Sequence, residues 1–323
     1  MVIRNKLLLL VAAICVSVVF VEFALRVFTE FPIHGRDANR KNHDILGYVV
    51  DPELPEIDAN GFRNPRQTQP VEWVAIGDSF TYGYGVSSEE SWPAQLADRL
   101  NRTVYNYGVG GYGIVHYRWL FDLALEKKPQ AIVLALFLPN DLEDACKMAR
   151  NAHSNAEFRK RGLDFSHCET ETGNAARDHS NKIRRGGFRG WYLSTALGSA
   201  IQEVAIRPLQ RYRHPERFTS IHYGDRETIL WSRRVQKHRR STDVEREEIA
   251  IALKTLEIFL DEMLLTARAA SIRFGVLFIP SKENALFEQI DTDEPLYPMF
   301  ERTVKQERDL TERLEKFLLE RGV

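Results

Sequence analysis

The segment that most constrains the fold is Ala131–Leu138, an unbroken run of apolar residues. A strand that is apolar throughout, with no alternation, is typical of a parallel sheet covered on both faces. Val71–Ile76, Thr103–Tyr107 and Phe274–Ile279 have comparable apolar or aromatic character over a similar length. We therefore expect four buried strands.

Amphipathic segments separate these strands. The spacing of apolar residues predicts helices over Ser91–Asn101, Val115–Lys127, Val244–Ser271 and Met299–Arg321, with Ser91 as a candidate N-cap. Strands that alternate with helices predict a doubly wound α/β domain with a parallel sheet. A chain of 323 residues with 44% apolar content is long enough to bury such a core.

An unusual residue follows each of the first three strands. Ser79 follows the first, the glycine run at Gly110 and Gly111 follows the second, and Asn140 follows the third. Because the carboxyl ends of parallel strands meet at one edge, these residues should converge there. A serine nucleophile needs hydrogen-bond donors for the oxyanion that forms when it attacks a carbonyl, and the Ser79 amide, a glycine amide and the Asn140 side chain suit that task. An ordinary Gly-Asp-Ser turn is the alternative interpretation of the first site.

Three motifs carry a family resemblance. GDSFTYG at Gly77–Gly83, NYGVGG at Asn106–Gly111 and PND at Pro139–Asp141 resemble, in that order, the first three sequence blocks of the SGNH or GDSL-like hydrolases. The resemblance implies a flavodoxin-like three-layer α/β/α sandwich. It also implies hydrolysis or transfer of acyl groups without a metal or other cofactor.

The resemblance assigns roles by position. Ser79 would be the nucleophile, Gly111 the glycine donor of the oxyanion hole and Asn140 its amide donor. Leu138 stands where a glycine is common in the third block. Asp78 and Asp141 flank these positions, and we expect them to hold loop backbone.

The general base is the largest departure from the family pattern. The resemblance implies a histidine in an Asp-x-x-His block after the last strand, but the last histidine of this sequence is His238. We therefore expect a domain that is incomplete at its C-terminus and lacks that block. A literal Asp-x-x-His at Asp164–His167 lies out of order and is more simply a chance match. His116 is more simply a capping or packing residue.

The N-terminus predicts a membrane anchor. An apolar run extends from Leu7 to Val21 and resumes after Glu22, and counted through Leu25 it is close to the roughly 20 residues that cross a bilayer. Arg4 and Lys6 precede it, and no small-residue cleavage site follows. We expect residues 1–28 to be an uncleaved signal anchor with the catalytic domain outside the cytoplasm, a cleaved signal peptide being the alternative.

Composition changes along the rest of the chain. Residues 29–69 are expected to be a tether and surface segment, and residues 70–323 the hydrolase domain. Residues 142–242 form a helical and irregular insertion with roughly twice as many basic as acidic residues. The insertion, including an apolar helical face within Trp191–Ile206, is either a lid that meets an anionic surface or a basic subdomain packed on the core.

The remaining composition excludes other classes. Three cysteines are too few for a disulfide scaffold and lack metal-ligand spacing, although Cys146 and Cys168 could pair outside the cytoplasm. A net charge of -1 gives no case for nucleic acid. The family resemblance therefore implies a serine-dependent ester hydrolase or O-acyltransferase, which we expect to act on an acylated carbohydrate or lipid. The alternative is a catalytically degenerate domain that binds a glycan or a protein through the same crevice.

Overall fold

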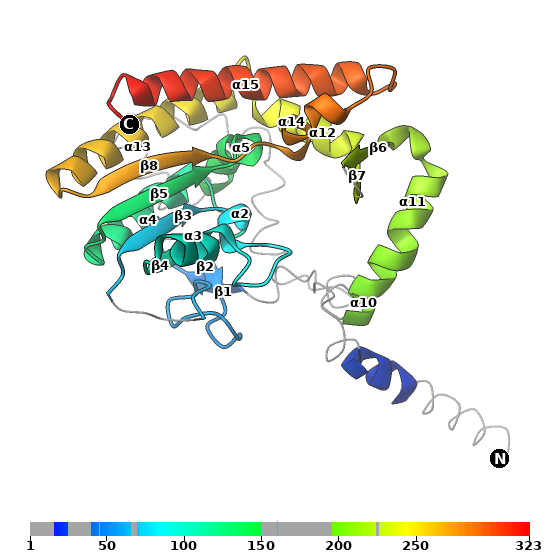
Figure 1. Cartoon of the computed structure of the whole chain (residues 1–323), viewed down its shortest axis with the longest axis horizontal. Helices are drawn as coiled ribbons and strands as arrows, with labels where there is room; N and C mark the ends of the chain where they lie inside the picture. The colour runs from blue at the N-terminus through cyan, green and yellow to red at the C-terminus, as the bar shows by residue number, and fades with distance from the viewer. Residues whose placement is uncertain are drawn as a thin grey trace. The chain divides into compact units, whose positions relative to one another are not determined.

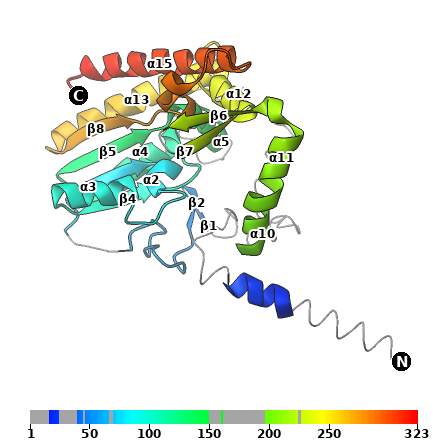
Figure 2. The same ribbon diagram turned by 45° about the vertical axis from the view of Figure 1, so that its right-hand side comes forward.

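The computed structural model describes residues 16–24, 40–44, 46–65, 70–149, 160, 196–223 and 226–323. The chain divides into two compact units. One comprises residues 41–176 and 216–323 and contains the central sheet (Figures 1 and 2), and the other comprises residues 1–40 and 177–215.

The central sheet has four parallel strands, in the order β4-β3-β5-β8 (Figure 1). They are β3 (Trp73–Gly77), β4 (Val104–Gly108), β5 (Ala131–Leu136) and β8 (Arg273–Phe278). Each predicted strand is present to within two residues, and the parallel sheet is confirmed. β5 ends before Leu138, because α5 begins there.

Helices cover both faces of this sheet. Asn106 of β4 donates to the Thr81 carbonyl of α2 (Ser79–Tyr82), whereas Tyr107, the next residue, reaches the Leu123 carbonyl of α4 (Ile114–Glu126). Successive side chains of a strand point to opposite faces, so α2 and α4 lie on opposite sides. This arrangement gives three layers.

The remaining helices complete the layers. α3 (Trp92–Leu100) joins α2 against β4, while α5 (Leu138–Ala149) and α13 (Glu247–Ala269) pack beside α4. α15 (Tyr297–Leu319) adds Leu310, Leu314 and Leu318 to the same core. Ser91 does occupy the N-cap position of α3, although its hydroxyl donates to the Ser88 carbonyl and does not cap the helix.

Residues 40–44 and 46–65, the described part of the expected tether, contain regular structure. β1 (Arg40–His43) and β2 (Gly47–Val50) form a two-stranded sheet, and Leu46, Val49 and Phe62 are buried in the main core. These apolar residues follow no regular period, so their pattern predicts neither a strand nor a helix within residues 29–69.

The loop that follows is built around the buried carboxylate of Asp58. It accepts hydrogen bonds from the Phe62 amide at 3.1 Å, from Asn64 Nδ2 at 3.0 Å and from the Tyr105 hydroxyl. Arg63 donates to the carbonyl oxygens of Gly83 at 2.9 Å and Val86 at 3.2 Å. The loop is thereby tied to the turn that follows α2.

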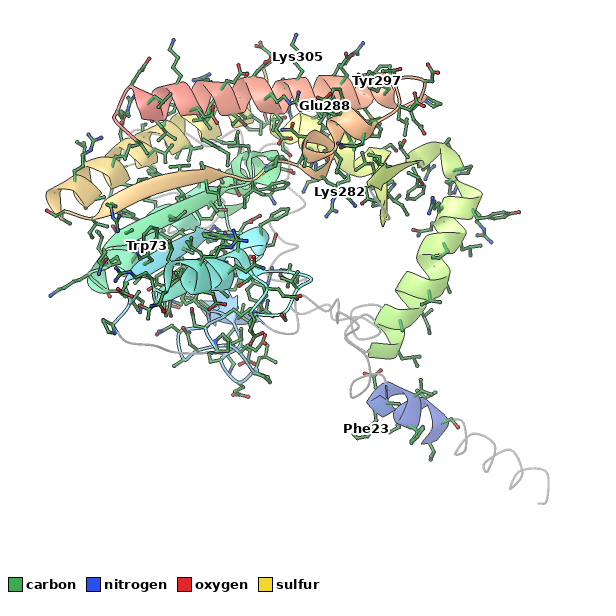
Figure 3. All side chains as sticks on the ribbon, in the orientation of Figure 1. Phe23, Trp73, Lys282, Glu288, Tyr297 and Lys305 are labelled. Carbon is green, nitrogen blue, oxygen red and sulfur yellow. The ribbon has the colours of Figure 1, made fainter. Side chains whose placement is uncertain are left out.

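The insertion contains an unpredicted hairpin. β6 (Phe218–Tyr223) and β7 (Arg226–Trp231) pair antiparallel after the short η2 (Pro215–Arg217), and α12 (Ser232–Ser241) packs against α5 and α15. After β8 come α14 (Lys282–Ala285) and η3 (Phe287–Gln289). Lys282, labelled in Figure 3, donates to the Ile229 carbonyl of β7 at 3.5 Å. A second core cluster of Ile221, Leu230, Val235, Ile290 and Phe300 holds the hairpin to this C-terminal region.

In the smaller unit, residues 196–213 are helical. They form α10 (Ala196–Ile201), the π-helical η1 (Gln202–Ile206) and α11 (Arg207–Arg213). Ile201 and Val204 of the predicted apolar face are exposed. The choice between a lid and a packed subdomain stays a prediction.

Residues 16–24 form a helix, and no helix in the described ranges is both long and apolar enough to cross a membrane. Residues 1–15 and 25–39 lie outside the description, so the signal anchor stays a prediction. Asp164–His167 and Cys168 also lie outside it, and so the disulfide with Cys146 is untested.

Candidate active site

Ser79 is the first residue of α2, and only Asp78 separates it from the carboxyl end of β3. Asp78 caps this helix, since its Oδ1 accepts the Phe80 amide at 2.9 Å. Ser79 is half-buried, while the Phe80 side chain is 45% exposed. The strand end and the cap together hold the serine hydroxyl at the sheet edge where α/β folds bind ligands.

Asp78 joins the first and third motifs. Its Oδ2 accepts hydrogen bonds from Ser79 Oγ and from Asn140 Nδ2, each at 3.3 Å. An amide nitrogen carries two hydrogens, so one anchors Asn140 and the other is left for a ligand. Burial raises the pKa of Asp78, and the donors from Phe80, Asn140 and Ser79 counteract that rise.

The glycine loop passes beside Ser79. A Cβ placed on Gly110 would lie 3.6 Å from the Ser79 Cβ and 2.8 Å from the Tyr84 ring. Gly111 has φ +87°, a conformation that favours glycine. The structure thus brings together the three segments that the sequence analysis expects to meet, with Ser79, Gly111 and Asn140 at one edge of the sheet.

A second network connects the glycine loop to the Asn140 segment. Tyr117 Oη lies 2.8 Å from Asp141 Oδ1 and 3.3 Å from the Tyr112 carbonyl, and Asp141 Oδ2 accepts the Phe137 amide at 2.7 Å. Burial, and then the charge of Asp78, raise the pKa of Asp141 well above its ordinary value. The hydroxyl of Tyr117, which donates to Asp141 Oδ1, and the Phe137 amide oppose this rise.

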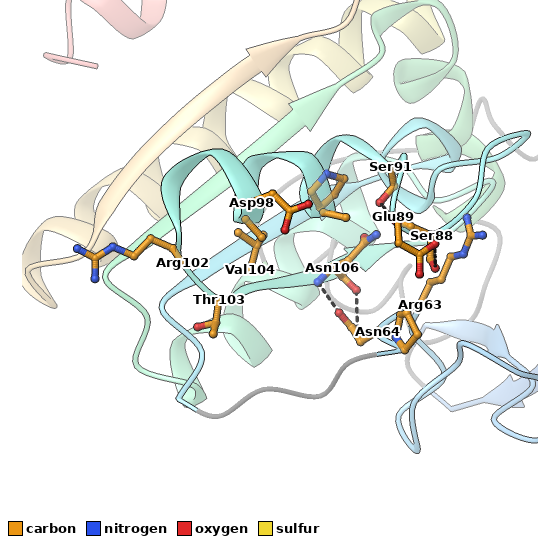
Figure 4. Close-up of a pocket in the computed structure, with 14 residues that line it drawn as sticks. Arg63, Asn64, Ser88, Glu89, Ser91, Asp98, Arg102, Thr103, Val104 and Asn106 are labelled. Carbon is orange, nitrogen blue, oxygen red and sulfur yellow. Dashed lines mark hydrogen bonds between the residues drawn. The ribbon is translucent and has the colours of Figure 1, made fainter.

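Both aspartates therefore hold backbone amides, as the sequence analysis expects. Asn106 has a comparable role that the sequence analysis missed. Its Oδ1 accepts the Gly108 amide at 2.7 Å, and its Nδ2 donates to the Thr81 carbonyl at 2.9 Å. The backbone N–H of Asn106 donates to Asn64 Oδ1 at 2.8 Å (Figure 4). The only signal in the sequence is a polar residue inside an otherwise buried strand.

The histidines near the sheet edge have other partners. His116 Nδ1 accepts the Gly113 amide at 3.2 Å and its ring stacks on Tyr112, which is the capping and packing role expected of it. His238 Nδ1 lies 2.5 Å from Glu283 Oε1 in a buried pair that the sequence analysis missed. The His238 ring packs edge-on against Phe137. Within the described ranges, the hydrogen bond of the Ser79 hydroxyl goes to Asp78.

Two cavities lie near these elements. One, of about 410 Å³, borders α2 and is lined mainly by apolar residues, including Phe80, Tyr84, Val86, Leu277 and Ile279. The other, of about 250 Å³, lies between α3 and the Arg63 loop, with Asn64 and Asn106 at its centre (Figure 4). Phe80, the residue after Ser79, lines the first cavity, but none of the three predicted site residues lines either cavity.

Comparison with known proteins identifies one family model. Residues 75–164, which include all three motifs, match the model of the GDSL-like Lipase/Acylhydrolase family. A solved structure of a G-D-S-L family protein from Desulfitobacterium hafniense DCB-2 aligns at 16% identity, over 74% of this chain and 99% of that chain, with a TM-score of 0.22. A search of curated proteins returns no match.

Proposed function

This chain carries a domain of the GDSL-like lipase/acylhydrolase family, and from that premise we propose that it cleaves carboxylic esters with Ser79 as the nucleophile. The observation that carries the proposal is the Asp78 carboxylate, which holds the Ser79 hydroxyl and the Asn140 amide on one oxygen. This contact brings a nucleophile and an oxyanion donor together at the edge of the sheet.

The chemistry follows from these groups. Ser79 Oγ forms a bond to the ester carbonyl carbon, and the carbonyl oxygen becomes an oxyanion. The Ser79 amide, the Gly111 amide and Asn140 Nδ2 are the donors proposed for that oxyanion. The serine proton passes to a base, a step that the family resemblance assigns to a histidine. When the tetrahedral intermediate collapses, the alcohol leaves with a proton and Ser79 keeps the acyl group.

The second half of the reaction decides between hydrolysis and transfer. Water that attacks the acyl-serine releases a carboxylic acid, whereas a hydroxyl of an acceptor yields a new ester. We propose an acylated carbohydrate or lipid as the substrate and a location outside the cytoplasm. The basic residues that precede the N-terminal apolar run, and the basic excess of residues 142–242, support these two points.

The experiment is hydrolysis of short-chain aryl esters, paired with labelling by a fluorophosphonate probe that reacts with activated serines. Ser79→Ala should abolish both signals. Ser87→Ala is the matched control, because Ser87 is an exposed serine of the following turn whose hydroxyl bonds only to Glu90 in the described structure. Labelling that persists in Ser79→Ala, or no labelling of the wild type, would contradict the proposal, and glycan or protein binding without labelling would favour a binding module.

A further inference from the structure

The carbonyl of Gly110 accepts a hydrogen bond from outside the sheet. Tyr48 of β2 donates its hydroxyl to this oxygen at 2.8 Å, although the two residues are 62 positions apart in the chain. The oxygen belongs to the peptide group that joins Gly110 to Gly111. That same peptide group contains the Gly111 amide, the proposed donor to the oxyanion.

Because of peptide geometry, this contact also sets the direction of the Gly111 N–H. A trans peptide is planar, and its C=O and N–H point in opposite directions. A hydroxyl that holds the oxygen therefore also fixes the direction of the Gly111 N–H, away from Tyr48. Donation to the carbonyl also polarises the peptide and strengthens the N–H as a donor.

This peptide needs an external support. It lies between two glycines, which have no side chains to pack and lose the most conformational freedom on folding. Gly111 has φ +87°, where few other residues are tolerated. Rotation of the Gly110–Gly111 peptide would turn the N–H away from its working direction, and the Tyr48 hydroxyl opposes that rotation.

Tyr48 is itself firmly held. The Tyr112 hydroxyl donates to the Tyr48 carbonyl, and the two rings pack at 5.4 Å with a 60° angle between them. Tyr112 is fully buried and stacks on His116 at 4.1 Å. Leu46 and Val49, on either side of Tyr48, are anchored in the main core. The hydroxyl is therefore placed by a packed cluster, as a supporting residue of a precise site must be.

We propose that Tyr48 is a positioning residue for the reaction, and that it acts by orienting the Gly111 amide toward the oxyanion. The proposal rests on the proposed function for its catalytic consequence. Because the Tyr48 hydroxyl donates to the Gly110 carbonyl, we assign its effect to the orientation of the Gly110–Gly111 peptide.

The test is Tyr48→Phe, which keeps the ring packing on Tyr112 and removes only the hydroxyl. Loss of a direct oxyanion donor costs about 10²–10³-fold in kcat, and loss of its support should cost about 10- to 100-fold with KM changed less than about twofold. The affinity for a boronic acid that mimics the tetrahedral intermediate should fall in parallel with kcat. Tyr107→Phe is the matched control, because its hydroxyl also donates to a carbonyl, that of Leu123, away from the glycine loop.

A second measurement does not depend on ester cleavage. In nitrogen-15 NMR spectra, the Gly111 amide should shift and exchange its proton faster in Tyr48→Phe, and should be unchanged in Tyr107→Phe. If the wild type neither reacts with the fluorophosphonate probe nor cleaves an ester, the proposed function fails. The NMR signal of the Gly111 amide in Tyr48→Phe then still shows whether Tyr48 orients this amide. Unchanged kcat in an active Tyr48→Phe enzyme, an unchanged Gly111 amide, or an equal loss in Tyr107→Phe would overturn the inference.

Discussion

Gly108, the last residue of β4, offers the sharpest test of how the sheet positions Ser79. A Cβ at this residue would lie 2.2 Å from the Tyr82 nitrogen, 2.5 Å from the Thr81 carbonyl carbon and 2.8 Å from the Thr81 Cβ. The first two are backbone atoms of α2, so no side-chain rotation relieves the contact. Ordinary van der Waals contact begins at 3.4 Å, so α2 must retreat by about 1 Å.

Gly108→Ala should therefore displace the nucleophile together with its helix. A displacement of about 1 Å in a reacting group costs about 10²-fold in rate, or about 2.7 kcal/mol in activation free energy. Overpacking should also lower the free energy of unfolding by about 1–3 kcal/mol. The assay is kcat for an aryl ester, with the enzyme concentration taken from fluorophosphonate titration so that only folded, reactive molecules are counted.

Gly275→Ala is the matched control. Gly275 lies in β8 of the same sheet, and a Cβ there meets nothing within 4 Å. The same methyl group should leave kcat within about twofold and the unfolding free energy within about 0.5 kcal/mol. Wild-type kcat and stability in Gly108→Ala, or equal losses in both variants, would refute the argument that close packing of β4 against α2 sets the position of Ser79.

Three further predictions concern groups around the site. Asn140→Ala should lower kcat by about 10²–10³-fold with little change in KM, and an equal change in KM would indicate a role in substrate binding instead. Since burial raises the pKa of Asp141, folding retains a proton that the unfolded chain releases, so stability falls as pH rises from about 4 through the raised pKa. Asp141→Asn cannot ionise, so in urea unfolding its stability relative to the wild type should increase from pH about 5 to about 8; a constant difference would argue that Asp141 ionises normally. His238→Ala leaves the buried Glu283 carboxylate without its partner and should lower the free energy of unfolding by roughly 3 kcal/mol. Adding Glu283→Gln to His238→Ala should recover part of that loss in urea unfolding.

Much of the fold and the meeting of the three motifs could be predicted from local pattern. Four buried strands separated by amphipathic helices leave few ways to build a sheet, and one edge must collect Ser79, Gly111 and Asn140. The end of β5 could not be placed so well. Phe137 and Leu138 continue the apolar run, but the Asp141 carboxylate captures the Phe137 amide and α5 starts at Leu138.

The supporting residues could not be predicted from the sequence. Tyr48 and Gly110 are 62 positions apart, and His238 and Glu283 are 45 positions apart. Each pair is recognised only when distant segments are packed together, because a single hydrogen bond imposes no period on the sequence. The two-stranded β1–β2 sheet and the β6–β7 hairpin could not be predicted for a related reason. Neither follows a clear alternation of apolar and polar residues.

The proton affinity of the Asp78 carboxyl group should change during turnover. In the resting site the Ser79 hydroxyl is among the donors that lower the pKa of Asp78 against the effect of burial. Once Ser79 is esterified it has no proton to give, so the pKa of Asp78 rises in the acyl-enzyme. Acylation should therefore shift the pH range in which this carboxyl group ionises upward, and deacylation should shift it back, so the two half-reactions should respond differently to pH.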